Sequence, residues 1–168
     1  MKNLPLGIQT FRKLIEGNYL YIDKTKDIYN LFLGQETYYF LSRPRRFGKS
    51  LLVTTLKEIF LGNQELFKGL WIYNKIEWKE YPIIHLDFSD MTLSSPDNLI
   101  KSIELQIKKI AIEYNISFNQ SFDYRSMFKE LIDNLSKINK VVILIDEYDK
   151  PIVEFVDNME IASEMRNI

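Results

Sequence analysis

Three consecutive residues, Gly48-Lys49-Ser50, constrain the fold of this chain more than any other feature. A short aromatic and β-branched run at 37–41 precedes them and predicts a strand, while apolar residues at helical spacing over 49–61 predict a helix. In a phosphate-binding loop, glycine adopts a backbone conformation that other residues avoid, and the amides at a helix start converge on phosphate oxygens. The stretch therefore predicts a strand, a phosphate-binding loop and a helix, in that order.

The loop departs from the general phosphate-binding pattern at its first position. That pattern, G-x-x-x-x-G-K-[ST], asks for glycine at position 43, where this chain has arginine. Pro44 offers another way to preset the turn, because its ring fixes φ. A helix start with a nearby lysine would explain Gly-Lys-Ser as well, so these residues alone leave both interpretations open.

A second chemical feature lies near the other end of the chain. The apolar run Val141–Ile145 predicts a strand buried on both faces, and it ends in Asp146-Glu147. Two adjacent carboxylates at the end of a buried strand are costly unless a cation meets them. Mg²⁺ held by Asp146, with Glu147 as general base for an attacking water, would meet this requirement. A strand end that simply reaches solvent is the alternative.

Around these features, apolar runs alternate with helical patterns. The remaining predicted elements are a strand at 81–88 and helices at 96–114, 126–138 and 151–165, with Leu99, Ile103, Ile107, Ile110 and Ala111 on one face of the first helix. Strands separated by helices indicate an α/β fold, here a three-layer sandwich around a mainly parallel sheet in one domain over residues 1–168. Because the sheet would otherwise end on an exposed edge, we expect the natural domain to continue or a partner to cover that edge.

Composition argues against several classes of function. The 22 Lys+Arg and 23 Asp+Glu residues leave a net charge of −1, which gives no general attraction to nucleic acid or to an acidic membrane. The chain has no cysteine, and its single histidine, His85, has no neighbouring soft ligands, which argues against disulfides and structural zinc. Without a signal-like apolar start or a stretch long enough to span a membrane, we expect a cytoplasmic protein.

Several longer stretches resemble one specific family. They are LPLGIQTFRKL (Leu4–Leu14), YIDKT (Tyr21–Thr25), LSRPRRFGKSLL (Leu41–Leu52), LFKGLWI (Leu66–Ile72), YPIIHLDFS (Tyr81–Ser89) and LIDEYDKPI (Leu144–Ile152). Together they resemble the AAA-ATPase-like proteins of bacteria and archaea, which often carry a C-terminal nuclease-like domain of the PD-(D/E)XK type. RPRRFGKS and IDEYDKP are very specific, and the family carries arginine at the position of Arg43.

The resemblance implies a P-loop NTPase-like domain that binds ATP and Mg²⁺, with RPRRFGKS as its Walker A and VVILIDE as its Walker B sequence. The residues implied to contact the nucleotide are Arg45, Arg46, Phe47, Gly48, Lys49, Ser50 and Leu51. Ser50 and Asp146 would hold the metal, while Glu147 and Lys49 would be catalytic, as general base and as stabiliser of phosphate charge. The resemblance also implies a γ-phosphate sensor and further strands beyond the acidic strand, so we expect the chain to be truncated after it.

The arginines of the loop have several interpretations. Arg43, Arg45 and Arg46 suit phosphate oxygens, an ion pair with the acids at 146–149, or plain solvation. Contact with a nucleic-acid backbone is the weakest option, because the net charge gives it no support.

Two further acids have both a structural and a functional interpretation. Asp87 ends its predicted strand as Asp146 does, so it either supports the metal from the same sheet edge or begins a turn. Asp23 either caps a helix that starts near Thr25 or lies near the adenine.

Two functions from different classes follow from these observations. The first is Mg²⁺-dependent ATP binding and, in the complete protein, ATP hydrolysis. The second is a scaffold or regulatory fragment that binds nucleotide without turnover. A homo-oligomer and a fused nuclease-like domain are further expectations, whereas the chain itself indicates neither a nucleic-acid nor a membrane partner.

Overall fold

Two hydrophobic cores organise the chain, one in each of two units. The computed structural model describes residues 2–33, 37–42, 44, 47–118 and 123–168, and the chain divides into unit 1, residues 1–81, and unit 2, residues 82–168. The core of unit 1 is rich in aromatic rings, whereas that of unit 2 joins one strand to its helices.

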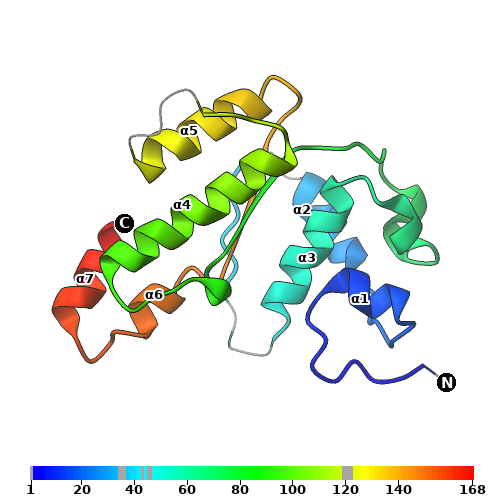
Figure 1. The fold of residues 1–168 in the computed structure, drawn as a ribbon. Helices are drawn as coiled ribbons and strands as arrows, with labels where there is room; N and C mark the ends of the chain where they lie inside the picture. Colours follow the sequence, from blue (N-terminus) through cyan, green and yellow to red (C-terminus); the bar gives the residue numbers. More distant parts are fainter. Residues whose placement is uncertain (1, 34–36, 43, 45–46, 119–122) are drawn as a thin grey trace. The chain divides into compact units, whose positions relative to one another are not determined.

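Unit 1 is built from helices and short 3₁₀ turns. Its elements are α1 (Phe11–Glu16), α2 (Thr25–Leu33), α3 (Lys49–Phe60), η1 (Gln64–Phe67) and η2 (Trp71–Asn74) (Figure 1). The ring of Phe11 stacks on Phe67 with centroids 4.6 Å apart, and Phe67 in turn packs on Trp78 at 5.0 Å. Because these rings come from α1, η1 and the segment after η2, their burial joins elements that local sequence does not connect.

The helix α3 matches its predicted bounds closely. It begins directly after Gly48 and ends at Phe60, with Gly62 in the left-handed conformation at φ 71°. The amide of Gly62 donates to the carbonyl of Ile59, and the amide of Asn63 donates to that of Glu58. This pair of bonds is a Schellman motif, which satisfies carbonyls that a helix end otherwise leaves without partners.

The strand predicted at 37–41 is wrong. Residues 38–42 belong to no regular element, and the side chains of Tyr38 and Phe40 are 91% and 74% exposed. Aromatic and β-branched residues favour strands because they pack well on a pleated, half-buried surface. Residues 37–41 have a high strand propensity, but their side chains are not buried against other residues, so the propensity alone does not produce a strand.

Unit 2 contains a two-stranded parallel sheet. Strand β1 (Ile83–Asp87) pairs with β2 (Val142–Asp146), in a register that runs from Ile83 opposite Val142 to Asp87 opposite Asp146. Both strands were predicted from the sequence and are confirmed, and their parallel pairing agrees with the predicted α/β class. The larger three-layer sandwich stays a prediction.

Two long helices form the apolar layer of unit 2. Helix α4 (Pro96–Glu113) contacts β1, α5 (Tyr124–Leu135) and α7 (Met159–Asn167) (Figure 1). The five residues predicted on one face of α4 are all buried, which confirms the helical spacing. The start of α5 precedes its predicted position because the Asp123 side chain accepts hydrogen bonds from the amides of Arg125 and Ser126, which caps the helix there.

Two predictions for the end of the chain are wrong. The single helix expected at 151–165 is divided into α6 (Lys150–Val153) and α7, because Asn158 accepts a hydrogen bond from the amide of Ile161 and so caps a new helix. Strand β2 is not buried on both faces, since Ile143 and Ile145 are 42% and 47% exposed. Their register partners on β1, Ile84 and Leu86, are buried in the helical core, which covers β1 more completely than β2.

Within the described ranges, no helix combines the length and apolar character that crossing a membrane requires.

Candidate functional site

Gly48 has the backbone conformation that a phosphate-binding loop requires. Its φ of 75° and ψ of 26° place it in the left-handed region, immediately before the first residue of α3. Among the described residues other than its two chain neighbours, no heavy atom lies within 4 Å of the position where a Cβ would stand. The glycine is therefore favoured here by its backbone conformation. A residue with a side chain would be strained there by about 1–2 kcal/mol.

The start of α3 presents groups that suit an anion. The first amide to donate within the helix is that of Leu52, which bonds to the carbonyl of Gly48, and no side chain caps this end. The preceding amides of Lys49, Ser50 and Leu51 therefore have no intrahelical acceptor, as at any helix start. Among the described residues, Lys49 has no ion-pair partner and the Ser50 hydroxyl has no hydrogen-bond partner. The helix dipole adds to their attraction for phosphate.

The remaining residues predicted to contact the nucleotide are Arg45, Arg46, Phe47 and Leu51. Arg45 and Arg46, like Arg43, lie outside the described residues. Phe47 is 64% exposed, and its amide donates to the carbonyl of Pro44 over 3.4 Å. The side chain of Leu51 packs against the core of unit 1, so any contact it makes with a ligand would come from its backbone.

An ion pair between the exposed Arg12 and the buried Glu58 holds α3 in place within unit 1. Arg12 on α1 donates from Nε and Nη2 to the two carboxylate oxygens of Glu58 on α3, at 3.0 and 2.6 Å, and Asn63 donates to Glu58 over 2.7 Å. The hydrogen bond to Glu58 raises the pKa of Arg12 above its usual value. Because Glu58 is 7% exposed, this bidentate partner is what allows its charge to be buried.

Asp23 has a structural role that joins two parts of unit 1. One carboxylate oxygen accepts hydrogen bonds from the amide and hydroxyl of Thr25 at the start of α2, and the other accepts from the amide of Trp71 over 2.7 Å. The Thr25 hydroxyl in turn accepts from the amide of Ile72. Partial burial opposes ionisation of Asp23, but these hydrogen bonds outweigh it and lower the pKa. The predicted capping of the helix start by Asp23 is confirmed, whereas no sequence pattern predicted its bond to Trp71.

In unit 2 the two strands end in acids at the same sheet edge. Asp87 and Asp146 are register partners, and the carboxylate of Asp146 is buried, with the residue 6% exposed. One oxygen of Asp146 accepts from the amide of Glu147 over 3.0 Å, and one oxygen of Asp87 accepts from the amide of Ser89 over 2.8 Å. This confirms that both acids lie at one edge, where ligands bind in open parallel sheets.

Glu147 has a strained backbone. Its φ of 53° lies in the left-handed region, which residues other than glycine and asparagine seldom adopt. Such a conformation persists only where the surroundings impose it, and these positions cluster at functional sites. The strain therefore favours a functional role for the residue predicted as general base.

Two residues that support this edge were missed in the sequence. The Oε1 atom of Gln106, on α4, accepts a hydrogen bond from the amide of Asp87 over 3.2 Å. Its Nε2 atom donates a hydrogen bond to the carbonyl of Asp87 over 2.8 Å. Lys150 donates from Nζ to the carbonyl of Ser89 over 2.7 Å. A signal for Gln106 was present, because it is the polar residue that follows Ile103 by three positions beside the apolar face of α4.

The structure brings the predicted residues together as two sets. Gly48, Lys49 and Ser50 form a possible anion-binding helix start in unit 1, and Asp146 and Glu147 form an acidic strand end in unit 2. A single site made by both sets is a prediction. Among the described residues, no cluster of three or more His, Cys, Asp or Glu side chains could hold a metal by itself.

Comparisons with known proteins agree with the motifs. A protein from Azotobacter chroococcum mcd 1, described as "Uncharacterized protein in vnfD 5'region", is 42% identical over 172 residues. That alignment covers 99% of this chain and 33% of the relative, so the chain spans about a third of that protein's length. No solved structure matches the chain significantly. The family described as predicted AAA-ATPase matches residues 5–168, and the chain therefore belongs to this AAA-ATPase-like family.

Proposed function

We propose that this protein binds ATP together with Mg²⁺ and, in its complete form, hydrolyses the bond between the β- and γ-phosphates. Membership of a family of predicted AAA-ATPases supports nucleotide binding in general. The observation that carries the finer proposal is the left-handed Gly48 directly before α3, beside amides and a lysine that have no partner of their own among the described residues.

The residues present fit a nucleotide-bound magnesium ion. Ser50 and Asp146 offer hydroxyl and carboxylate oxygens, which are the hard ligands that Mg²⁺ prefers. Mg²⁺ is usually held by one or two carboxylates together with substrate phosphates, so a larger protein cluster is not required. When bound, the ion would neutralise charge on the phosphate oxygens.

Each protein group has a defined task in this proposal. The amides of residues 49–51 and the Lys49 ammonium bind the phosphates and stabilise the charge that develops during transfer. Asp146, held by the amide of Glu147, keeps one carboxylate oxygen for the metal's hydration shell. Glu147 accepts a proton from the attacking water, and its strained backbone fixes the direction from which it does so.

The test of binding compares two lysines of the same helix. Lys49→Ala is expected to weaken the affinity for ATP with Mg²⁺ by at least about a hundredfold, because charge-assisted bonds to phosphate are lost. Lys57→Ala, near the other end of α3, is the matched control and should leave the affinity unchanged. Equal affinity in Lys49→Ala and the wild type, measured by calorimetry, contradicts the proposal.

A second test separates hydrolysis from binding alone. Glu147→Gln is expected to bind ATP as tightly as the wild type and to release no phosphate, whereas Glu154→Gln, an exposed nearby acid, should retain activity. If the wild type binds ATP but never releases phosphate, the non-hydrolysing scaffold is the better description. A homo-oligomer, a cytoplasmic location and a fused nuclease-like domain remain proposals for the complete protein.

A further inference from the structure

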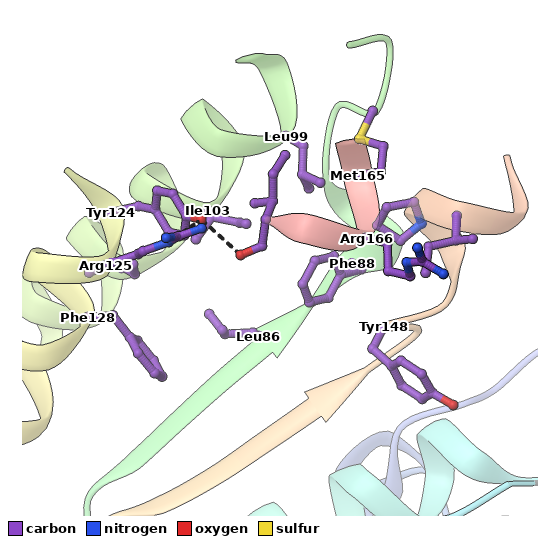
Figure 2. A pocket seen from close by; sticks show the side chains of 14 residues that line it. Leu86, Phe88, Leu99, Ile103, Tyr124, Arg125, Phe128, Tyr148, Met165 and Arg166 are labelled. Atoms are coloured by element: carbon purple, nitrogen blue, oxygen red, sulfur yellow. Dashed lines mark hydrogen bonds between the residues drawn. The ribbon is translucent and has the colours of Figure 1, made fainter. Parts of the chain in front are cut away.

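Unit 2 contains a pocket that the predicted ATP and Mg²⁺ contacts do not use. It has a volume of about 480 Å³ and lies among the end of β1, helices α4, α5 and α7, and the segment that follows Glu147 (Figure 2). A pocket of about 300–1,000 Å³ is the size that takes a small organic ligand. None of the residues predicted to bind ATP or Mg²⁺ lines it.

The walls of the pocket are mainly apolar and aromatic. Leu86 belongs to β1, and Phe88 follows directly after this strand. Ile103 belongs to α4, and Phe128 belongs to α5. Tyr148 and Ile152, which are 46% and 36% exposed, complete the wall without belonging to the core. Such a lining favours an alkyl or aromatic body, because its transfer from water is driven by the hydrophobic effect.

The charged residues of the lining all have the same sign. Arg125 and Arg166 are the charged side chains that line the pocket, and Figure 2 shows Arg125 beside Tyr124 on one side and Arg166 on the other. No acidic side chain lines the pocket, and neither arginine forms an ion pair among the described residues. The chain as a whole has a net charge of −1, so this local positive charge does not reflect overall composition.

Arg125 is held in position and Arg166 is not. Arg125 donates from Nε to the Tyr124 hydroxyl over 2.8 Å and from Nη2 to the carbonyl of Asn167 over 3.2 Å. The Tyr124 hydroxyl donates to the carbonyl of Ile168 over 2.8 Å. These bonds join the start of α5 to the end of α7 and fix one side of the pocket. The guanidinium of Arg166 has no hydrogen bond within the described part of the chain, so its donors are available.

We propose that this pocket binds a small amphipathic anion, with an alkyl or aromatic body and a single carboxylate, sulfonate or phosphate group. The apolar walls hold the body, and Arg166, with support from Arg125, holds the anionic group through charge-assisted hydrogen bonds. A cation of the same shape would meet two arginine side chains and no acidic side chain. The proposal is independent of ATP binding, because the pocket lining includes none of the residues predicted to bind ATP or Mg²⁺.

The first experiment titrates the chain with anilinonaphthalene sulfonate, an aromatic anion whose emission rises in apolar surroundings. We expect saturable binding at one site per chain, with displacement by decanoate and none by decyltrimethylammonium, which has the same tail and the opposite charge. Arg166→Gln should weaken binding about tenfold, whereas Lys129→Gln, exposed on α5 outside the lining, should not change it. Binding that never saturates, or equal displacement by the cation, overturns the proposal.

A second pair of variants separates binding at this pocket from general exposure of apolar surface. Ile152 lines the pocket and Val153 does not, although both are exposed and adjacent on α6. Ile152→Asp is expected to reduce binding of the probe at least tenfold by adding a repelling charge, whereas Val153→Asp should leave it unchanged. Unchanged far-ultraviolet circular dichroism establishes that both variants are folded. Equal binding in the two variants also overturns the proposal.

Discussion

Among the residues with a left-handed backbone, one in each unit belongs to the predicted ATP and Mg²⁺ site. In unit 1 the residue is Gly48, and it comes directly before a helix; in unit 2 it is Glu147, and it comes directly after a strand. The conformation costs glycine nothing, but it costs a residue with a Cβ about 1–2 kcal/mol. Unit 1 therefore forms its anion-binding geometry without strain, while unit 2 keeps a strained carboxylate, as expected where a side chain is needed for chemistry.

The two units also differ in how their elements are held together. Unit 1 has no sheet of its own among the described residues, apart from an isolated bridge, and joins its elements through stacked rings and the polar contacts of Glu58 and Asp23. Unit 2 packs long apolar helix faces on β1. Polar contacts specify geometry and depend on both partners, whereas apolar burial contributes most of the stability.

The largest expected effect is on the core of unit 2. Ile107 on α4 is fully buried, and Ile107→Ala is expected to lower the free energy of unfolding by about 3–4 kcal/mol, from lost burial and the cavity it leaves. Both tryptophans, Trp71 and Trp78, belong to unit 1, so their fluorescence reports that unit alone. We expect the circular dichroism midpoint in urea to fall further than the fluorescence midpoint. Equal shifts would mean that the two units unfold as one.

The next effect concerns the ion pair that holds α3. Arg12→Met leaves the buried carboxylate of Glu58 with Asn63 alone and should destabilise the protein by about 2–3 kcal/mol. The double variant Arg12→Met/Glu58→Met removes the uncompensated charge and should regain much of that loss. Urea unfolding of the two variants measures the difference. If the double variant is less stable than Arg12→Met, the unpaired charge of Glu58 is not the main cause of the instability of Arg12→Met.

The two left-handed residues are expected to respond with opposite signs. Gly48→Ala should destabilise the protein by about 1 kcal/mol, and Glu147→Gly should stabilise it by a similar amount by relieving strain. Glu147→Ala keeps the strain and is the matched control for loss of the carboxylate. Thermal unfolding of these variants is the measurement. A Glu147→Gly variant no more stable than Glu147→Ala would show that the backbone is not strained.

The smallest effect is a pH dependence that comes from Asp23. Because its pKa is lower in the folded than in the unfolded protein, its ionised form contributes stability above the unfolded pKa of about 4, and this is lost as pH falls through the folded pKa. The stability difference between the wild type and Asp23→Asn should therefore shrink between neutral pH and pH of about 3. Asp157→Asn, an exposed acid, controls for the loss of one charge. A difference that is constant with pH contradicts this assignment.

Features that depend on neighbouring residues could be predicted from the sequence. The bounds of α3 follow from glycines before and after a helical pattern, and the buried face of α4 follows from its periodicity. The two acids at the ends of β1 and β2 were recognisable because apolar strands end in them, and the parallel register then places them side by side. Family membership rests on the same local motifs.

Only the tertiary structure decided which surfaces are covered. Periodicity reports that Ile143, Ile145 and the run at 37–41 are suited to burial, but what packs on them depends on residues far away in the chain. The contacts of Glu58 with Arg12, of Asp23 with Trp71 and of Arg125 with Asn167 likewise join distant segments. Such contacts leave no periodic pattern, because they are set by the three-dimensional path of the backbone and not by spacing along it.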